Sequence, residues 1–184
     1  MPATRTPAGD ELLQGRFRGC LLGLAVGDAL GGRFEARTAE HIREKVPTVA
    51  ALVEYPQDEL WYTDDTQMAI GVAEALLDHG QIVEEHLCRA FVANYVPSRG
   101  YGWGARAVLD AMEEGRDYRQ VAAAHFPGGS YGNGAAMRVA PVGLLFRDHP
   151  ELLWEQARLS ALPTHVRGVD RRRLAPEVAA RVSY

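Results

Sequence analysis

The stretch of this chain that best indicates its fold is Trp61-Tyr62-Thr63-Asp64-Asp65-Thr66-Gln67-Met68. Apolar residues then recur at helical spacing until His79-Gly80, a typical helix end, so the pattern predicts a helix over 64–79. Two adjacent carboxylates, flanked by two threonine hydroxyls, therefore stand at the start of a helix. Such oxygen ligands suit Mg²⁺, Mn²⁺ or Ca²⁺, and this set of four contains no soft ligand for zinc or copper.

The same residues also have a purely structural interpretation. Thr or Asp is a favoured N-cap, acidic residues suit the positive end of the helix dipole, and Asp64 with Gln67 matches a capping box. A cap needs only one side chain, however, and adjacent carboxylates repel each other unless a cation relieves the repulsion. A helix cap and a metal site both remain open on the residues alone.

Helical spacing extends over most of the chain, and together with the lack of any alternating strand pattern it predicts an all-α fold. The expected helices cover residues 11–30, 64–79, 83–95, from the loop at 99–104 through 112 to near 115, 119–125, from the loop at 127–134 to about 146, and 150–161. In the first of these, Gly19, Gly23, Gly27 and Gly31 form a bare stripe, which favours tight packing against another element.

Composition bounds the class of protein. Of the 184 residues, 47% are apolar and 24% charged, as in a globular domain, and the net charge of −4 argues against binding nucleic acid or a membrane surface. The longest apolar stretch, 20–27, is too short to span a bilayer, and we find no targeting signal. Cys20 and Cys88 are expected to be buried free thiols, which fits a reducing cytoplasm.

Two further acidic residues stand near the end of the first helix. Asp28 continues the apolar stripe of Phe17, Leu21 and Leu24, and a buried carboxylate must be hydrogen-bonded, paired or metal-linked. It is either a structural residue accepting bonds from a neighbouring helix N-terminus or part of the metal site. Glu35 follows the glycines on a loop that could place it over a pocket, although it could equally be an ordinary exposed acid.

A third motif, at residues 130–138, is rich in small side chains and reads Ser130-Tyr131-Gly132-Asn133-Gly134-Ala135-Ala136-Met137-Arg138. Small residues at a helix start expose backbone N–H groups, which suits a phosphate. The motif matches neither a Walker A loop nor a dinucleotide-binding fingerprint, so a simple helix-entry turn is the alternative.

In this order, the motifs resemble the ADP-ribosylglycohydrolase family, of the type that removes ADP-ribose from dinitrogenase reductase. The resemblance covers residues 15–165 and rests on five stretches: Gly19-Cys20-Leu21-Leu22-Gly23 running into Gly27-Asp28-Ala29-Leu30-Gly31 and Glu35, Tyr62 to Met68, Arg99-Gly100-Tyr101-Gly102, Gly132 to Arg138, and Thr164-His165.

The resemblance implies an all-α domain with two Mg²⁺ ions, or Mn²⁺, at the floor of a cleft. It makes Thr63, Asp64 and Asp65 metal ligands and places Glu35, with Asp65, at the catalytic centre. It further implies that the substrate is held by Ser130, Tyr131, Gly132, Asn133 and Gly134, which cradle the diphosphate and ribose, and by His165 near the distal ribose or adenosine. The implied partner is an ADP-ribosylated protein or a small molecule containing ADP-ribose.

The family completes its metal site with an Asp-x-Asp-Thr motif in the C-terminal half, and no Asp-x-Asp occurs here. We therefore expect a flexible N-terminus over 1–10, an incomplete domain over 11–165 that lacks the second set of metal ligands, and a divergent basic tail over 166–184. The tail is either a basic helix or an artificial terminus. A C-terminally truncated copy of the enzyme is the resulting expectation.

Three functions are compatible with these features. The first is Mg²⁺-dependent removal of ADP-ribose by cleavage of an N- or O-glycosidic bond at the ribose anomeric carbon. The second is an inactive remnant that binds ADP-ribose weakly or not at all. The third is a divalent-metal hydrolase acting on a phosphate ester, since oxygen ligands and a glycine-rich phosphate loop permit that chemistry too.

Overall fold

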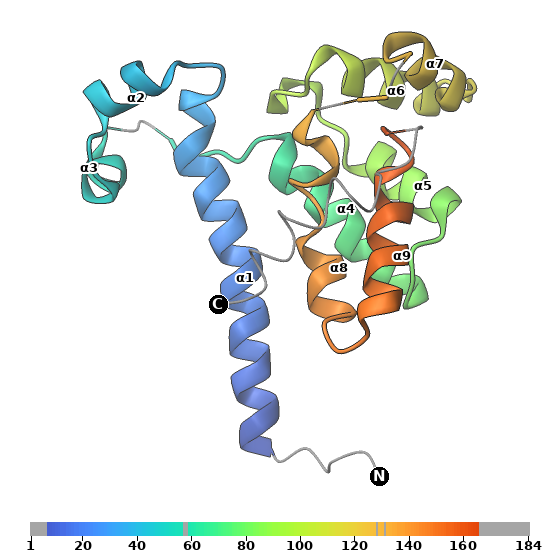
Figure 1. Cartoon of the computed structure of the whole chain (residues 1–184), viewed down its shortest axis with the longest axis horizontal. Helices are drawn as coiled ribbons and strands as arrows, with labels where there is room; N and C mark the ends of the chain where they lie inside the picture. Colours follow the sequence, from blue (N-terminus) through green and yellow to red (C-terminus); the bar gives the residue numbers. More distant parts are fainter. Residues whose placement is uncertain (1–6, 57–58, 128, 131, 166–184) are drawn as a thin grey trace. The chain divides into compact units, whose positions relative to one another are not determined.

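The computed structural model describes residues 7–56, 59–127, 129–130 and 132–165, with the side chains of 7–9 left aside. The described residues form helices, short 3₁₀ turns and loops, without a strand among them (Figure 1). The all-α prediction is confirmed.

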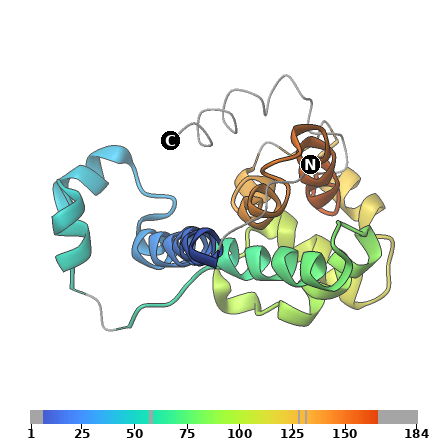
Figure 2. The ribbon, with the colours of Figure 1, turned by 90° about the horizontal axis from the view of Figure 1, so that it is seen from below.

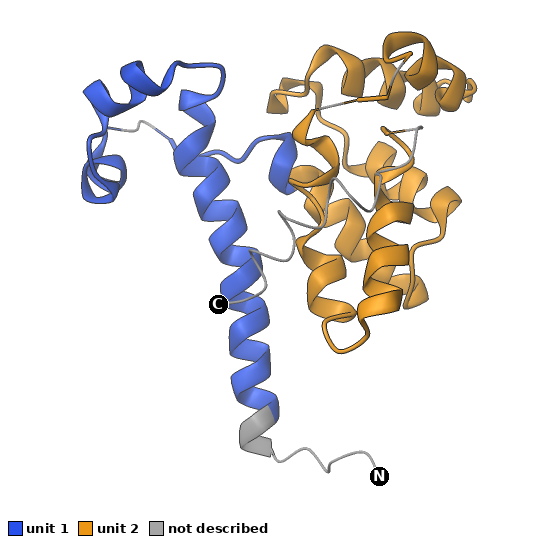
Figure 3. Ribbon diagram, viewed as in Figure 1, with its two compact units in different colours: residues 1–66 blue, residues 67–184 orange. Residues whose placement is uncertain are grey.

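The chain divides into two compact units, residues 1–66 and residues 67–184 (Figure 3). The boundary falls in the first turn of helix α4 (Asp64–His79). Each unit is described by itself.

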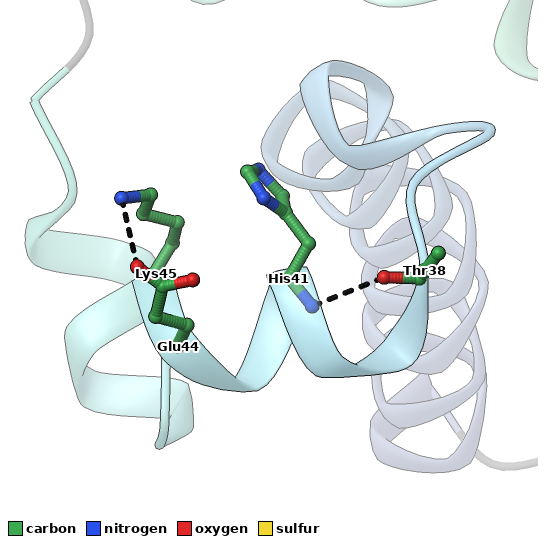
Figure 4. Close-up of polar contacts among 4 residues, drawn as sticks. All are labelled: Thr38, His41, Glu44 and Lys45. Atoms are coloured by element: carbon green, nitrogen blue, oxygen red, sulfur yellow. Dashed lines mark hydrogen bonds and ion pairs between the residues drawn. The ribbon is translucent and has the colours of Figure 1, made fainter.

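The first unit consists of one long helix and three short elements: α1 (Pro7–Gly31), the 3₁₀ turn η1 (Gly32–Phe34), α2 (Ala39–Lys45) and α3 (Val49–Glu54). The sequence did not predict α2 or α3, because six or seven residues are too few for a helical period. Each instead begins at a threonine cap. The Thr38 hydroxyl accepts from the His41 N–H at 3.2 Å (Figure 4). The Thr48 hydroxyl caps α3 in the same way, accepting from the Ala51 N–H at 3.1 Å.

Two expectations for α1 are not met within the first unit. A Cβ added at Gly19, Gly23, Gly27 or Gly31 would meet no atom of the described residues of this unit within 4 Å, so the stripe of glycines makes no tight contact in it. Cys20 is exposed rather than buried, whereas Cys88 is partly buried, and both are free thiols as expected. Helical spacing of apolar residues predicts which face of α1 is apolar, but it does not specify what covers that face.

The second unit is a helical bundle built on α4, which has the predicted bounds of 64–79. Its other elements are α5 (Glu84–Asn94), η2 (Pro97–Arg99), α6 (Trp103–Glu113), α7 (Tyr118–His125), η3 (Asn133–Ala135), α8 (Ala140–Leu145) and α9 (Pro150–Ala161). Helix α6 packs on α7 and α5, and α9 packs on α8 and α5; Figures 1 and 2 show α8 beside α9. Glu84 ties α7 to α5, because it accepts from the Tyr118 hydroxyl and pairs with Arg119 at 2.7 Å.

Apolar side chains of these helices form the core of the second unit, with Val72 from α4, Leu87 and Phe91 from α5, Leu109 from α6 and Val142 from α8 almost entirely buried. The helix expected from about 134 to 146 is interrupted. Only a 3₁₀ turn forms at 133–135, and α8 begins at Ala140 with Pro141 in its first turn. A proline suits the first turn of a helix, whereas inside a continuous helix it would clash with the carbonyl of Met137.

Candidate functional site

The carboxylate of Asp28, near the end of α1, binds the start of α4. It accepts four hydrogen bonds, from the backbone N–H groups of Thr63 and Thr66 at 2.9 and 3.1 Å and from both threonine hydroxyls at 2.6 Å. The first N–H groups of a helix lack partners within the helix, so a carboxylate placed there satisfies them and suits the positive end of the dipole. Of the two interpretations of Asp28, the structural one is confirmed.

Thr63 is the residue immediately before α4, and its hydroxyl accepts from the Asp65 N–H at 3.3 Å while donating to Asp28. The capping box of Asp64 with Gln67 is wrong, because the Gln67 side chain lies in the second unit's core. There its Oε1 accepts from the Val96 N–H at 3.0 Å and from the Tyr101 hydroxyl at 2.8 Å. Thr63 and Asp28 therefore cap the start of α4.

Glycine is required at residue 32 for this arrangement. A Cβ at Gly32 would lie 2.8 Å from the Thr63 methyl group, closer than carbon atoms can approach without a shift. The turn η1 therefore passes directly against the start of α4. Glu35, which ends η1, donates its N–H to the Gly32 carbonyl at 3.3 Å and comes near the same carboxylates.

Four carboxylates gather around the start of α4, and they repel one another. Burial raises the pKa of Asp65 to about 7, and the charges of Asp64, Asp28 and Glu35 add to the rise. Burial also raises the pKa of Glu35, again with help from Asp64 and Asp28. Asp64 is buried, at 9% exposure, beside this concentration of negative charge. A divalent cation would remove the repulsion that raises both pKa values.

The donor chemistry of this cluster fits a hard divalent cation, since its side chains offer carboxylate and hydroxyl oxygens. Among the described residues, however, no three Asp, Glu, His or Cys side chains converge closely enough to hold an ion by themselves. By themselves, these side chains could complete only part of a coordination shell. Mg²⁺ usually keeps several water ligands and binds through one or two carboxylates, so a partial shell is compatible with it.

A second group of predicted residues lies in the second unit, on the loop before η3. The Ser130 hydroxyl accepts from the Gly132 N–H at 3.1 Å, and the Asn133 carbonyl accepts from the N–H groups of Ala136 and Met137. Tyr131 falls outside the described residues. The loop therefore makes a tight turn into a 3₁₀ helix, not directly into an α-helix.

His165 is buried against this loop. Its Nε2 lies 3.2 Å from the Gly132 carbonyl, its Nδ1 lies 2.8 Å from the Thr164 hydroxyl, and its ring packs on Gly134, where an added Cβ would be 3.3 Å from Cε1. Burial lowers the pKa of His165, and the positive charge of Arg138 acts in the same direction. The histidine is therefore neutral at pH 7.

A cavity of about 220 Å³ opens beside the loop, lined by Phe126, Pro127, Gly129, Ser130 and Thr164 together with two alanines of α7. Trp103 stacks on Phe126 behind it, with ring centroids 5.3 Å apart. Ligand pockets usually measure about 300–1,000 Å³. This cavity can therefore hold part of a nucleotide-sized ligand.

The family profile of the ADP-ribosylglycohydrolases matches residues 10–175 of this sequence. The chain belongs to the ADP-ribosylglycohydrolase family. That match includes both groups of residues just described, the carboxylates at the start of α4 and the loop with His165. The resemblance that the motifs indicated is confirmed.

Several curated ADP-ribosylglycohydrolase relatives are similar in sequence. ADP-ribosylhydrolase ARH3 of Danio rerio is 34% identical over 172 residues, which is 90% of this chain and 46% of the relative. ADP-ribosylhydrolase ARH3 of Homo sapiens is 37% identical over 162 residues, covering 82% of this chain and 44% of the relative. ADP-ribosyl-[dinitrogen reductase] glycohydrolase of Rhodospirillum rubrum is 32% identical over 158 residues, covering 82% and 51% respectively. The chain thus spans about half the length of the curated relatives that it matches.

Sequence reasoning named Thr66 only as a candidate oxygen ligand, and Arg138 and Thr164 only as parts of motifs, so it missed the structural roles of all three. Thr66 binds Asp28, and Arg138 with Thr164 holds His165. A signal for Arg138 was present, since it is a charged residue between Met137 and Val139 in an apolar stretch. Among the described residues, no helix is long and apolar enough to cross a bilayer.

Proposed function

We propose that this chain carries the metal-binding and substrate-binding residues of a Mg²⁺-dependent hydrolase that releases ADP-ribose from a modified protein or small molecule. The observation that supports this most directly is the group of four carboxylates at the start of α4, where burial first and the neighbouring charges second raise the pKa of Asp65 to about 7. Neighbouring carboxylates repel one another and destabilise a protein without bound metal, and a cation bound among them would remove that repulsion. Family membership connects the cluster to ADP-ribose chemistry.

The proposed chemistry is hydrolysis at the ribose anomeric carbon. When bound, Mg²⁺ would orient the ribose hydroxyls and lower the pKa of a water ligand. Thr63, Asp64 and Asp65 would hold the metal. Glu35 has a pKa raised by partial burial and by the charges of Asp64 and Asp28, which suits a carboxylate that would move a proton to or from the reacting oxygen or nitrogen. The transition state resembles an oxocarbenium ion, which nearby carboxylates stabilise electrostatically.

The loop residues Ser130, Tyr131, Gly132, Asn133 and Gly134, with His165, would bind the ADP-ribose. Small residues let backbone N–H groups approach the diphosphate. The cavity between Phe126 and Thr164 offers an apolar wall with polar groups at its edge, which suits a ribose or a base. The substrate is proposed to be an ADP-ribosylated protein, or a small molecule containing ADP-ribose, in the cytoplasm, bound by a domain over residues 11–165.

The first test is a thermal melt of the purified chain with and without Mg²⁺ and ADP-ribose. A ligand that binds the folded state raises Tm, so each should raise it if its site is competent. Asp64→Ala and Asp65→Ala should each abolish the Mg²⁺-dependent shift and any release of ADP-ribose from a modified protein. Asp78→Ala, an exposed acid in the last turn of the same helix, is the matched control and should leave both unchanged.

The reaction products distinguish glycosidic hydrolysis from the two alternative functions. Free ADP-ribose supports glycosidic hydrolysis, whereas free phosphate would indicate a phosphoester hydrolase instead. Saturable ADP-ribose binding without turnover at any Mg²⁺ concentration would indicate a binding domain. Full turnover in Asp64→Ala or Asp65→Ala would overturn the metal assignment.

A further inference from the structure

We propose that Arg138 and Thr164 are positioning residues that hold His165 in one neutral tautomer, with its proton on Nε2, and thereby fix the backbone of the substrate loop at Gly132. The importance of that loop for ADP-ribose rests on the proposed function. The hydrogen-bond chain itself rests only on contacts within the second unit.

The chain begins at a fully buried cation. Arg138 has 0% exposure, and its guanidinium lies 4.8 Å from the centroid of the Phe91 ring. One terminal nitrogen donates to the Ser160 carbonyl at 2.8 Å and to the Thr164 hydroxyl at 2.9 Å, and the other contacts the Met68 sulfur at 3.5 Å. Among the described residues no carboxylate pairs with this charge. The last carbonyls of α9, at the negative end of its dipole, stabilise it instead.

The other end of the chain is a carbonyl. The Gly132 oxygen can only accept, so the contact of 3.2 Å to His165 Nε2 requires a proton on Nε2. A neutral imidazole has a single N–H, so Nδ1 must then be bare and must accept. The burial that lowers the pKa of His165 makes the doubly protonated form unfavourable.

The hydroxyl of Thr164 lies between Arg138 and His165, and these two residues determine the direction in which it donates its hydrogen bond. Arg138 can only donate, so Thr164 Oγ1 accepts from it, and the one proton of the hydroxyl is left for His165 Nδ1 at 2.8 Å. Every donor then points from Arg138 toward Gly132. Reversing the tautomer would leave two bonds unmade at once, because the buried hydroxyl proton and the Gly132 carbonyl would both lose their partner.

These hydrogen bonds fix the position of Gly132 relative to the end of α9. The His165 N–H donates to the Ala161 carbonyl at 3.0 Å, so the backbone of His165 is tied to the end of α9 while its ring is tied to Gly132. Ser130 holds the N–H side of the same glycine. Gly132 is therefore held from both sides, and both nitrogens of His165 are engaged, which leaves neither free to act as a general acid or base.

The test is ¹⁵N NMR of the histidine side chains near pH 7.5, with the His165 signals assigned by their loss in His165→Gln. The chain contains six histidines, so this assignment is needed. The wild-type chain should show a protonated Nε2 and a bare Nδ1 at His165. Thr164→Ser keeps the hydroxyl and should keep this pattern. Thr164→Val keeps the shape and removes the hydroxyl, so the bare Nδ1 loses its hydrogen bond while the Gly132 carbonyl still holds the proton on Nε2; the Nδ1 signal should move toward that of a bare nitrogen without a hydrogen bond. A protonated Nδ1 in the wild-type chain would overturn the proposal, and so would an unchanged Nδ1 signal in Thr164→Val.

ADP-ribose binding, measured by calorimetry, provides the second readout. Loss of one positioning hydrogen bond should weaken Kd by about 2- to 10-fold in Thr164→Val, and Thr164→Ser, which keeps the hydroxyl, should weaken it less than Thr164→Val does. Equal affinity in all three proteins would overturn the role in substrate binding. If the wild-type chain binds no ADP-ribose, the proposed function fails, and the NMR result alone still decides the tautomer.

Discussion

His165 shows how much of one residue's behaviour is set by its neighbours. In the sequence it is a histidine after a threonine, and the family resemblance alone placed it near the substrate. In the structure it is buried and its pKa is lowered, first by burial and then by the charge of Arg138. A histidine of this kind is a neutral hydrogen-bonding group, unlike the proton-exchanging histidines of many active sites.

This lowered pKa predicts a pH-dependent stability. Between the folded and the ordinary pKa of histidine, the unfolded chain binds more protons than the folded one, so the stabilisation is complete above about pH 6.5 and declines as pH falls below it. The slope from one proton is at most about 1.4 kcal/mol per pH unit. Urea denaturation of wild type and His165→Gln at pH 5.5 and 7.5 should show a smaller difference at the lower pH. A difference that grows on acidification would contradict the sign.

Arg138 and Asp28 mark the limit of sequence reasoning at this scale. The position of Asp28 on an apolar stripe correctly indicated that its carboxylate needs partners, and the neighbouring helix N-terminus was among those considered. Arginine is ordinarily exposed, and although the apolar neighbours of Arg138 in the sequence were a signal of burial, they do not show which groups bind it. Its partners, Ser160 and Thr164, are more than twenty residues away in the chain, and only the fold brings them together.

At the scale of an element, α4 also depends on residues that are distant in the sequence. The bounds of this helix were predictable, because the apolar period, the acidic first turn and the His79-Gly80 end all agree. The short helices α2 and α3 and the break before α8 were not, since a six-residue helix has no visible period and one proline moved a boundary. The cap on α4 comes from Asp28, which lies 35 positions before Thr63, and a local pattern cannot reveal it.

Removing that cap should destabilise the protein. Asp28→Ala leaves the two N–H groups and two hydroxyls at the start of α4 without their acceptor, and we expect a loss of about 2 kcal/mol or more in the free energy of unfolding. Asp28→Asn keeps a carbonyl oxygen for most of these bonds and should cost less than half as much. Urea denaturation measures both changes.

Thr38→Ala supplies the matched control, because it removes an N-cap from the exposed helix α2, which has no buried residue. Its cost should lie at the low end of about 0.5–2 kcal/mol. If Asp28→Ala costs no more than Thr38→Ala, the Asp28 contacts contribute little to stability, and the orientation of Asp64 and Asp65 must have another origin.

At the scale of the whole molecule, the buried core lies in the second unit, where α4, α5, α6 and α8 contribute side chains of near-zero exposure. Among the described residues, η1, α2 and α3 of the first unit contain no buried residue. The stability of the loop with His165 therefore depends on a packed bundle, and that of the carboxylate cluster on the polar contacts of Asp28.

This difference predicts where a large-to-small substitution is costly. Leu109→Ala, at 0% exposure in α6, should lower the free energy of unfolding by about 2–5 kcal/mol through lost burial and a cavity. Leu77→Ala, at 84% exposure on α4, is the control and should change it by less than about 0.5 kcal/mol. Denaturant midpoints for the two variants measure both values, and similar losses would mean that the core has been misplaced.

The two cysteines of the chain differ in solvent accessibility, and that difference has a practical consequence. The Cys20 thiol stands exposed on α1, whereas burial raises the pKa of Cys88 and keeps it in the unreactive thiol form at neutral pH. A maleimide dye at limiting concentration would therefore attach at a single position without any mutagenesis. Cys20 lies eight residues before Asp28 on the same helix, so such a dye would give a fluorescence signal from the element that holds the start of α4.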